Sequence, residues 1–446
     1  MKQLTKKQSL FLMAAVMLSG IFAACSSNFN ELTQSENDLS NAGNTRAVEP
    51  AVIQEDSLAL IAIFNATNGK NWVGKTHWLH SPVDQWEGVK TAVVNGKRRV
   101  VKLNLGNMNL RGNLPEEIGN LTELKWINLS ANWYLSGKIP ESFYKLTQLE
   151  VWKMQYTIIT GELSPAIGNL TKLDTLDLWT SNYEMLDNYN HINFPDPKDP
   201  SYFDYQKPNK YKLSGNLPKE IGKLKNLRYL DLGKQGFSGQ LPVEMAQMDK
   251  LNYLDISDCC FTEGIPAAFG QMKSIETLLA SGNQFTASIP EEICNAETLR
   301  EVYIADNQIE GQLPRNIGKL KNLRSLDVQN NKLSGTIPAS LAQNLQLGLL
   351  YLNNNKLSGQ IPVEIAHERC RLTFANFSNN NLIGSLPEFP GNPYLLQYSD
   401  ERWYPVIEAR GNKLSGKLPW HYIRWTHIAK NALLPQQNGF GFENLK

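Results

Sequence analysis

The sequence predicts a repeat solenoid rather than a compact domain, and two observations support that fold class. A Leu-Pro or Ile-Pro step recurs along most of the chain, and its proline returns every 24 residues from Pro218 to Pro362. Within each copy, apolar residues alternate with polar ones, which is the pattern of a strand with one buried face. A chain of 446 residues is also too long for one ordinary hydrophobic core, whereas stacked coils can bury it piece by piece.

The copy at residues 323–338 shows what each position contributes. Leu326 and Val328 alternate with polar neighbours and predict a short strand. Asn331 ends the strand, and its amide can satisfy backbone groups of the turn, so stacked copies predict an asparagine ladder. Gly335 allows a tight turn, and the closing proline fixes the start of an extended or short helical return.

The pattern LxxLxLxxNxLxGxIPxxIGxL resembles the plant-type leucine-rich repeat of plant receptor ectodomains and polygalacturonase inhibitors. The resemblance covers about residues 100–430. It implies a right-handed superhelix of about 12 repeats whose strands form one concave parallel sheet. Some copies depart from the pattern, and we expect these to distort their turns without breaking the solenoid. The departures are Met108, Thr157, Ser181, Gln235 and Cys259 at the ladder position, and Glu263 and Ala287 at the glycine position.

Residues 1–24 have the composition of an export signal. Three lysines precede an apolar run that is too short to span a membrane comfortably. The following Ile21-Phe22-Ala23-Ala24-Cys25 resembles a lipobox, in which a lipid such as palmitate is attached to the cysteine, although Phe22 stands where leucine is usual. Ordinary secretion and an uncleaved anchor are the alternatives. Ser26 resembles the sorting position of Gram-negative lipoproteins and suggests the outer membrane and the cell surface.

The array is expected to carry a tether and two caps. Residues 25–50 are polar and predict a flexible tether. Residues 51–99 combine helical spacing of apolar residues at 56–64 with three tryptophans, and they resemble the N-terminal cap of plant-type arrays. The usual cap cysteines are missing, so Trp72, Trp78 and Trp86 must pack in place of a disulfide. The repeats then occupy residues 100–419, and 420–446 are expected to form the C-terminal cap.

Charge and motifs argue against several function classes. The net charge is +1, or −2 without residues 1–24, which gives no support to nucleic-acid binding. No nucleotide-binding motif or cofactor site is evident, and the six histidines belong to no recognisable nucleophilic arrangement. His77 and His80 have a possible metal-ligand spacing, but they flank Trp78 in the cap and lack obvious partner ligands, so no metal site is expected. Asp231 and Asp255 are expected on a shallow, wet surface that would leave their pKa values nearly unchanged. Cys259, Cys260, Cys294 and Cys370 fit neither a zinc site nor a disulfide scaffold and are expected as free thiols.

The residues expected on the concave face combine aromatic rings with carboxylates. Exposed rings on a rigid sheet can contribute contact area at little entropic cost. The aspartates also match the repeat consensus, so they are weaker candidates than the rings. The candidate ligand-binding residues are Trp126, Tyr156, Asp177, Trp179, Tyr229, Asp231, Tyr253, Asp255, Tyr303 and Tyr351.

One long insertion interrupts the period. Pro165 and Pro218 lie 53 residues apart, 29 more than one repeat, and the excess occupies residues 182–212. This stretch holds seven aromatic and five acidic residues. Long insertions in compact repeats are often functional, and an inserted island can shape the ligand site of plant receptors. By that resemblance Tyr202 and Tyr205 join the candidate contacts, although a tolerated surface excursion is the alternative.

Together these features predict a monomeric binding protein, not an enzyme, that meets the membrane only through a lipid. A mixed aromatic and acidic face favours a protein partner, as for an adhesin or receptor-like component. A glycan-binding lipoprotein of an uptake system is the alternative function, and a hydrolase is the third possibility.

Overall fold

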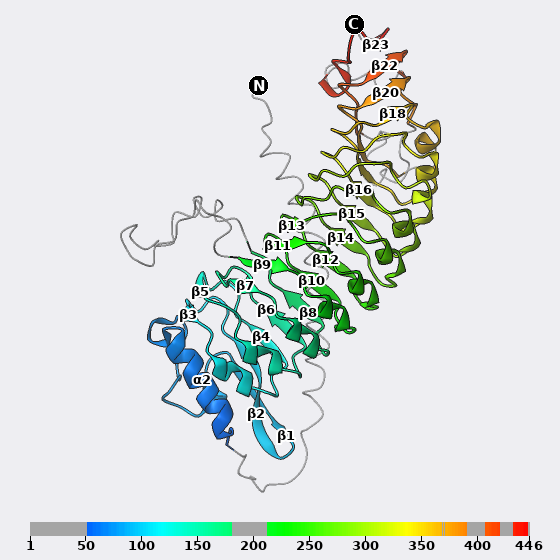
Figure 1. The fold of residues 1–446 in the computed structure, drawn as a ribbon. Coiled ribbons are helices and arrows are strands. Elements are labelled where there is room, and N and C mark those ends of the chain that lie inside the picture. The colour runs from blue at the N-terminus through cyan, green and yellow to red at the C-terminus, as the bar shows by residue number, and fades with distance from the viewer. Residues whose placement is uncertain are drawn as a thin grey trace, which may run out of the picture. The chain divides into compact units, whose positions relative to one another are not determined.

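The computed structural model describes residues 51–180, 212–367, 369, 371–389, 406–419 and 431–444. The chain divides into two units, Met1–Glu49 and Pro50–Lys446, and all described residues belong to the second (Figure 1). The predicted signal, Cys25, the tether, most of the 182–212 insertion and most of the C-terminal cap therefore lie outside the described residues.

One 13-stranded sheet runs through the described coils. Its twelve later strands are parallel and in register, one from each coil, and β1 pairs antiparallel with β2 at the N-terminal edge. This confirms the predicted solenoid with a parallel sheet. In order, the strands are β1 (Val89–Val94), β2 (Lys97–Asn104), β4 (Trp126–Asn128), β6 (Val151–Lys153), β8 (Thr175–Asp177), β10 (Tyr229–Asp231), β12 (Tyr253–Asp255), β14 (Thr277–Leu279), β15 (Glu301–Tyr303), β16 (Ser325–Asp327), β17 (Leu349–Tyr351), β19 (Phe374–Asn376) and β21 (Val406–Glu408).

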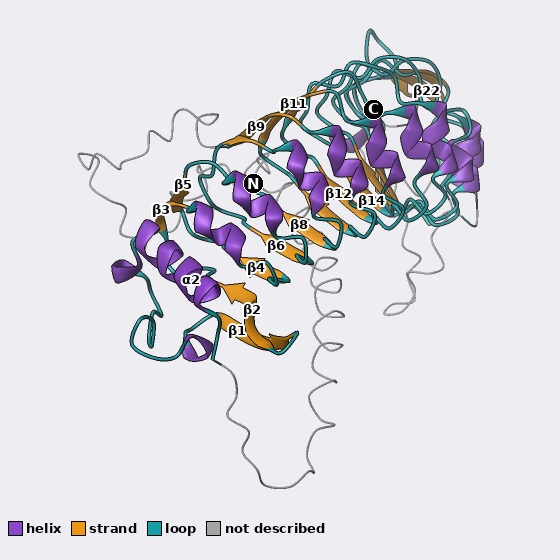
Figure 2. Cartoon of the chain, turned by 60° about the horizontal axis from the view of Figure 1, so that its bottom comes forward, coloured by secondary structure: helices purple, strands orange, loops and turns teal. Residues whose placement is uncertain are grey.

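Short 3-10 helices form the other side of most described coils (Figure 2). Most of them begin directly after the repeat proline, whose fixed φ prepares the backbone for the turn. They are η4 (Glu116–Asn120), η5 (Glu141–Lys145), η6 (Pro165–Asn169), η8 (Lys219–Lys223), η9 (Val243–Gln247), η10 (Ala267–Gln271), η11 (Glu291–Asn295), η12 (Ile317–Lys319), η13 (Ala339–Gln343) and η14 (Val363–Ala366).

Three smaller sheets form where each coil turns away from the main sheet. They pair segments around the repeat glycines, many of which have positive φ, such as Gly335 at 73°. The strands are β3 (Arg111–Asn113) with β5 (Tyr134–Ser136), then β7 (Gly161–Glu162), β9 (Leu213–Asn216), β11 (Gly236–Gly239) and β13 (Cys260–Phe261), and finally β18 (Ser358–Gly359), β20 (Asn381–Gly384), β22 (Lys413–Gly416) and β23 (Gly441–Phe442).

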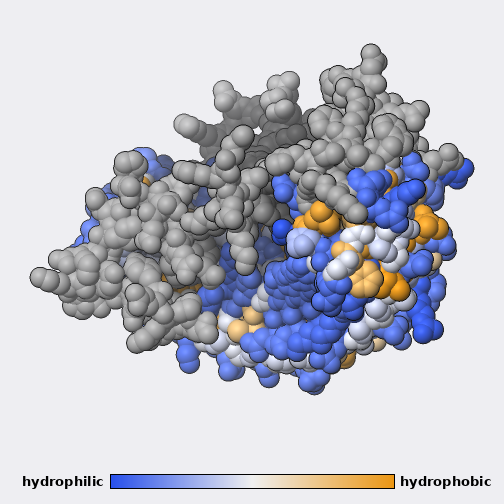
Figure 3. All heavy atoms as spheres, turned by 90° about the horizontal axis from the view of Figure 1, so that it is seen from above, coloured by the Kyte–Doolittle hydropathy of each residue, from blue (hydrophilic) through white to orange (hydrophobic). Residues whose placement is uncertain are grey.

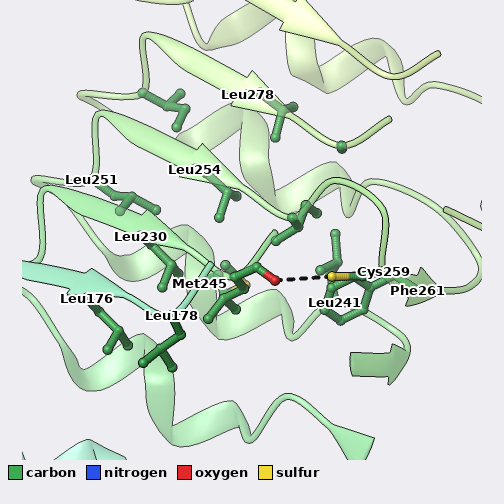
Figure 4. Close-up of a cluster of buried hydrophobic side chains, with 14 of the residues drawn as sticks. Leu176, Leu178, Leu230, Leu241, Met245, Leu251, Leu254, Cys259, Phe261 and Leu278 are labelled. Atoms are coloured by element: carbon green, nitrogen blue, oxygen red, sulfur yellow. Dashed lines mark hydrogen bonds between the residues drawn. The ribbon is translucent and has the colours of Figure 1, made fainter. Parts of the chain in front are cut away.

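The core consists of rows of equivalent side chains from successive coils. Leu176, Leu230, Leu254 and Leu278 stand one behind another on β8, β10, β12 and β14, and none is more than 2% exposed (Figure 4). Because each leucine is covered by the coils beside it, burial depends on stacking. The coloured part of the surface in Figure 3 is mostly hydrophilic, with a few small hydrophobic patches.

The asparagine ladder is present, and it continues through two coils in which another residue replaces the asparagine. Asn331 donates from Nδ2 to the Ile304, Val328 and Gln329 carbonyls, and its Oδ1 accepts from the Ile309 N–H at 3.0 Å. Our expectation of distorted turns is wrong at Gln235, whose longer amide bonds to the Leu178 carbonyl and the Leu213 N–H.

The thiol of Cys259 also replaces a ladder amide. It donates to the Leu232 carbonyl at 3.3 Å from a buried position (Figure 4). At the glycine position, Glu263 adopts the glycine-like φ of 62°, so the turn keeps its shape at the expense of backbone strain. Cys259, Cys260 and Cys294 are free thiols, and Cys370 lies outside the described residues.

A helix and a tryptophan cluster close the N-terminal end. The helix α2 (Gln54–Ala66) packs Phe64 against Trp72 and Trp78, and Trp86 contacts Trp78 with tilted rings whose centroids lie 4.7 Å apart. Each indole N–H donates to a backbone carbonyl, and the three tryptophans are at most 5% exposed. They form the core of this end, and the turns η2 (Gly69–Asn71) and η3 (Val83–Gln85) precede Trp72 and Trp86 in the chain.

Candidate functional site

Ten of the twelve candidate residues lie within the described part of the chain. Trp126, Tyr229 and Tyr253 begin their strands, whereas Asp177, Asp231, Asp255, Tyr303 and Tyr351 end theirs. Tyr156 and Trp179 follow β6 and β8 by two or three residues. Tyr202 and Tyr205 lie outside the described residues.

The first and last residues of these three-residue strands share one face, because side chains two apart point the same way.

Two aromatic groups occupy this face between β4 and β12. The tyrosine pair consists of Tyr229 and Tyr253, whose rings stack with centroids 4.5 Å apart and planes 5° from parallel. The loop aromatics are Trp133, Tyr156 and Trp179, with Tyr156 in contact with both tryptophans at 5.0 and 4.8 Å. Parallel pairing at one spacing per coil holds the tyrosine pair rigidly in place.

The carboxylate row, Asp177, Asp231 and Asp255, lies beside the tyrosine pair on three neighbouring strands in register. Asp231 accepts from the Gly233 N–H at 3.0 Å and from the Tyr229 hydroxyl at 3.1 Å. Asp255 accepts from the Ser257 N–H at 2.8 Å, and the Gln155 amide donates to Asp177. The three side chains therefore form a line of fixed hydrogen-bond acceptors.

The expectation that Asp231 and Asp255 keep nearly ordinary pKa values is wrong. Burial raises the pKa of Asp177 to about 7, and burial together with the two neighbouring aspartates raises that of Asp231 well above its ordinary value. The pKa of Asp255 is raised as well, mainly by burial, although the Ser257 hydrogen bonds oppose the shift. Asp177 is 3% and Asp231 6% exposed, so this part of the face is neither shallow nor wet.

Four segments, residues 250–272, 298–320, 322–344 and 346–367, match the Leucine Rich Repeat family model. The chain contains leucine-rich repeats and has the leucine-rich-repeat solenoid fold. Phytosulfokine receptor 1 of Arabidopsis thaliana is 32% identical over 95 residues, which is 20% of this chain and 9% of that receptor. Receptor-like protein 39 of the same plant is 32% identical over 124 residues, 28% of this chain and 14% of its own length. This leucine-rich-repeat protein thus matches only a small part of each curated relative.

Solved structures show the same architecture over more of the chain. The plant peptide hormone receptor RGFR1 in complex with RGF2 has a TM-score of 0.54 and 31% identity, covering 71% of this chain and 48% of that one. A leucine-rich-repeat protein of Leptospira interrogans has a TM-score of 0.51 and 26% identity, covering 77% and 73%. PEPR1–AtPEP1 has a TM-score of 0.62 at 22% identity and shows the fold alone. The chain spans about half of the first of these ectodomains.

The remaining candidates of this leucine-rich-repeat protein do not join the carboxylate row. Tyr303 and Tyr351 lie on β15 and β17, beyond β14, whose residues on this face are Thr277 and Leu279. Tyr351 instead contacts Phe374 with centroids 5.0 Å apart. Trp126 lies at the N-terminal end under Lys102, whose Nζ is 4.2 Å from the ring centroid. The candidates therefore occupy two regions of the sheet rather than one.

Three residues at the site were not among the candidates. Trp133 directly follows the ladder residue Asn132, at a position that the repeat template does not count as exposed. Gln155 and Lys234 stand at the seventh and eighth positions, where a polar side chain is unremarkable in sequence. The Lys234 Nζ lies 5.6 Å from the Trp179 ring centroid, and it also lowers the raised pKa of Asp255.

Among the described residues, no group of three or more histidine, cysteine or acidic side chains is placed to hold a metal ion. In the same part of the chain, no helix has the length and apolar character needed to cross a bilayer.

Proposed function

We propose that this protein is a membrane-tethered, surface-exposed binding protein that recognises a peptide or protein partner through the β4–β12 part of its sheet. The observation behind this proposal is the stacked tyrosine pair beside the carboxylate row and the loop aromatics. Rigid aromatic anchors with adjoining polar groups are the usual composition of energetically dominant interface residues. The likeness to RGFR1, a plant peptide hormone receptor in complex with RGF2, supports the same class of partner.

Binding without catalysis fits this site better than a hydrolase does. Raised pKa values alone would be compatible with acid–base chemistry. However, Asp231 and Asp255 already accept backbone N–H groups, and the row extends along the sheet instead of converging on one point. We therefore place the protein among non-enzymatic binding modules.

The double variant Trp179→Ala, Tyr229→Ala should lose binding to its partner. Each truncation removes a partly buried ring worth about 1–2 kcal/mol at an interface, so affinity should fall by at least about tenfold. A pull-down from surface proteins, quantified against wild type, measures the change. Val243→Ala, 57% exposed on η9 across the coil, is the control and should bind normally. Undiminished binding by the double variant would refute the placement of the site.

The membrane tether is proposed from the sequence around Cys25. In cells fed a palmitate analogue, wild type should be labelled and Cys25→Ala should not, because the lipobox-like sequence offers one acceptor thiol. Cys260→Ala, which changes a thiol in the folded repeats, should keep the label. Surface exposure is checked by protease treatment of intact cells. Equal labelling of wild type and Cys25→Ala would contradict the lipid anchor.

A glycan partner is the second candidate, and it would occupy the other region of the sheet. Tyr351 contacts Phe374 there, and a row of exposed amides runs alongside, with Asn379 donating to Asn354 and Asn354 to Asn330. Each amide keeps a donor and an acceptor site for sugar hydroxyls. If this candidate holds, a glycan array will show binding that Tyr351→Ala abolishes and the Trp179→Ala, Tyr229→Ala variant retains. If the array shows no binding, the glycan partner is refuted.

A further inference from the structure

The carboxylate row has more hydrogen-bond acceptors than donors. An ionised carboxylate offers about four acceptor sites. Asp177 receives one donor, from Gln155 to Oδ2, whereas its buried Oδ1 has no hydrogen-bond partner within the described coils. The Trp179 N–H stands near this carboxylate and stabilises its charge, but it does not reach hydrogen-bonding geometry. Beyond the nearby Trp179 N–H, this oxygen therefore has unused capacity to accept hydrogen bonds.

Within the described part of the chain, the charges around the row do not neutralise it. The titratable groups that face it are Lys153, Lys234, Asp258, Cys259, Tyr229 and Tyr253. Only the two lysines are cations, and Lys234 also lies over the Trp179 ring. Three carboxylates side by side on a sheet, with this much burial, are therefore short of positive charge.

The row also has a shape that suits a particular cation. Its members stand on adjacent parallel strands, about 4.8 Å apart, so two neighbouring carboxylates can receive donors from one planar group. The tyrosine pair supplies parallel ring faces on the same strands, and Asp255 and both tyrosines are only half-buried. A guanidinium donates through a rigid planar fork and stacks on aromatic rings, whereas an ammonium is a point charge.

We propose that the carboxylate row and the tyrosine pair together bind the guanidinium group of an arginine in the partner. This inference rests on the proposed function and adds to it the chemical class of the anchoring residue. The guanidinium approaches past Asp255, donates to carboxylates of neighbouring strands and packs against the tyrosine pair. Its positive charge offsets the repulsion within the row, including that on Asp177.

A fourth aspartate provides a matched comparison. Asp327 ends β16 at the same repeat position, is equally buried, and accepts from the Gln329 N–H at 3.0 Å and the Gln329 side-chain amide at 2.9 Å. Its neighbours in register are Tyr303 and Tyr351 instead of further aspartates. Asp327 is therefore a buried carboxylate with no aspartate on the neighbouring strands. We expect no arginine site there.

The test uses full-length protein in detergent and a random-peptide phage library as the probe. Wild-type protein, Asp255→Asn and Asp327→Asn are each used to select peptides. The best wild-type peptide is then synthesised with arginine, with lysine, or with citrulline, a neutral isostere of arginine. We expect arginine enrichment with wild type and Asp327→Asn but not with Asp255→Asn. Citrulline should weaken binding at least about tenfold, and lysine should fall between them.

The outcomes separate this inference from the proposed function. If peptides bind and depend on Tyr229 but show no preference for arginine, or bind equally well with citrulline, the arginine site is refuted and the peptide-binding function stands. Equal loss with Asp327→Asn would also refute it, because the row would then have no special role. If no peptide binds at all, the proposed function fails together with the inference. Thermal unfolding of each variant checks that the asparagine substitutions leave the fold intact.

Discussion

Replacing Asp56 with alanine should destabilise the N-terminal end of the solenoid by about 3–5 kcal/mol. Asp56 is fully buried on α2 and accepts from the Arg99 guanidinium at 2.9 and 3.1 Å and from the Val100 N–H at 2.7 Å. Its loss leaves a backbone N–H without an acceptor and a mostly buried guanidinium, 13% exposed, without its main counter-charge. Through these hydrogen bonds, Asp56 links α2 to β2.

The measurement is thermal unfolding combined with amide hydrogen exchange, because the end of a repeat array can open before the rest. Exchange should speed up in α2 and β2 and stay slow near β14. Asp84→Ala, an exposed acid in the same region, serves as the control. Arg99→Ala should cost a similar amount, and the double variant should cost less than the sum of the two. Asp56→Ala protein that melts and exchanges like wild type would disprove this role.

At the N-terminal end, the sequence predicts some features of the fold but not the ion pair of Asp56. The spacing of apolar residues predicted the helix, and the missing cap cysteines predicted the packed tryptophans. The ion pair was not predicted, because Asp56 and Arg99 lie 43 residues apart and each looks like an ordinary surface charge. The β1–β2 hairpin was not predicted either, since its alternation resembles that of the repeats that follow.

The candidate site was predictable in position but not in electrostatics. The repeat pattern assigns Tyr229, Tyr253 and the three aspartates to one face, because the period fixes which side chains point outward. Whether those aspartates are solvated depends on the residues of the adjacent coils, 24 or 54 positions away in sequence. The repeat consensus describes each coil alone, whereas the pKa values of Asp177 and Asp231 are raised mainly by burial and further by the charge of Asp255 on a neighbouring coil.

Replacing Asp177 with asparagine should stabilise the protein at alkaline pH and leave it nearly unchanged in acid. Folding raises the pKa of this carboxyl from an ordinary value of 3.8 to about 7, so the folded state holds a proton that the unfolded chain has released. The resulting stabilisation is complete below about pH 4 and is lost as the pH rises through about 7. With about 1.36 kcal/mol for each pKa unit, the loss is on the order of 4 kcal/mol.

Asparagine has nearly the same shape as the protonated acid and cannot ionise, so Asp177→Asn should not lose this stability at high pH. We expect the melting temperature of the variant to exceed that of wild type at about pH 8 and to match it only below about pH 4. Asp249→Asn removes an exposed charge that pairs with Lys273 and should give no such difference. A variant that is equally stabilised, or equally destabilised, at both pH values would show that Asp177 remains ionised in the folded protein.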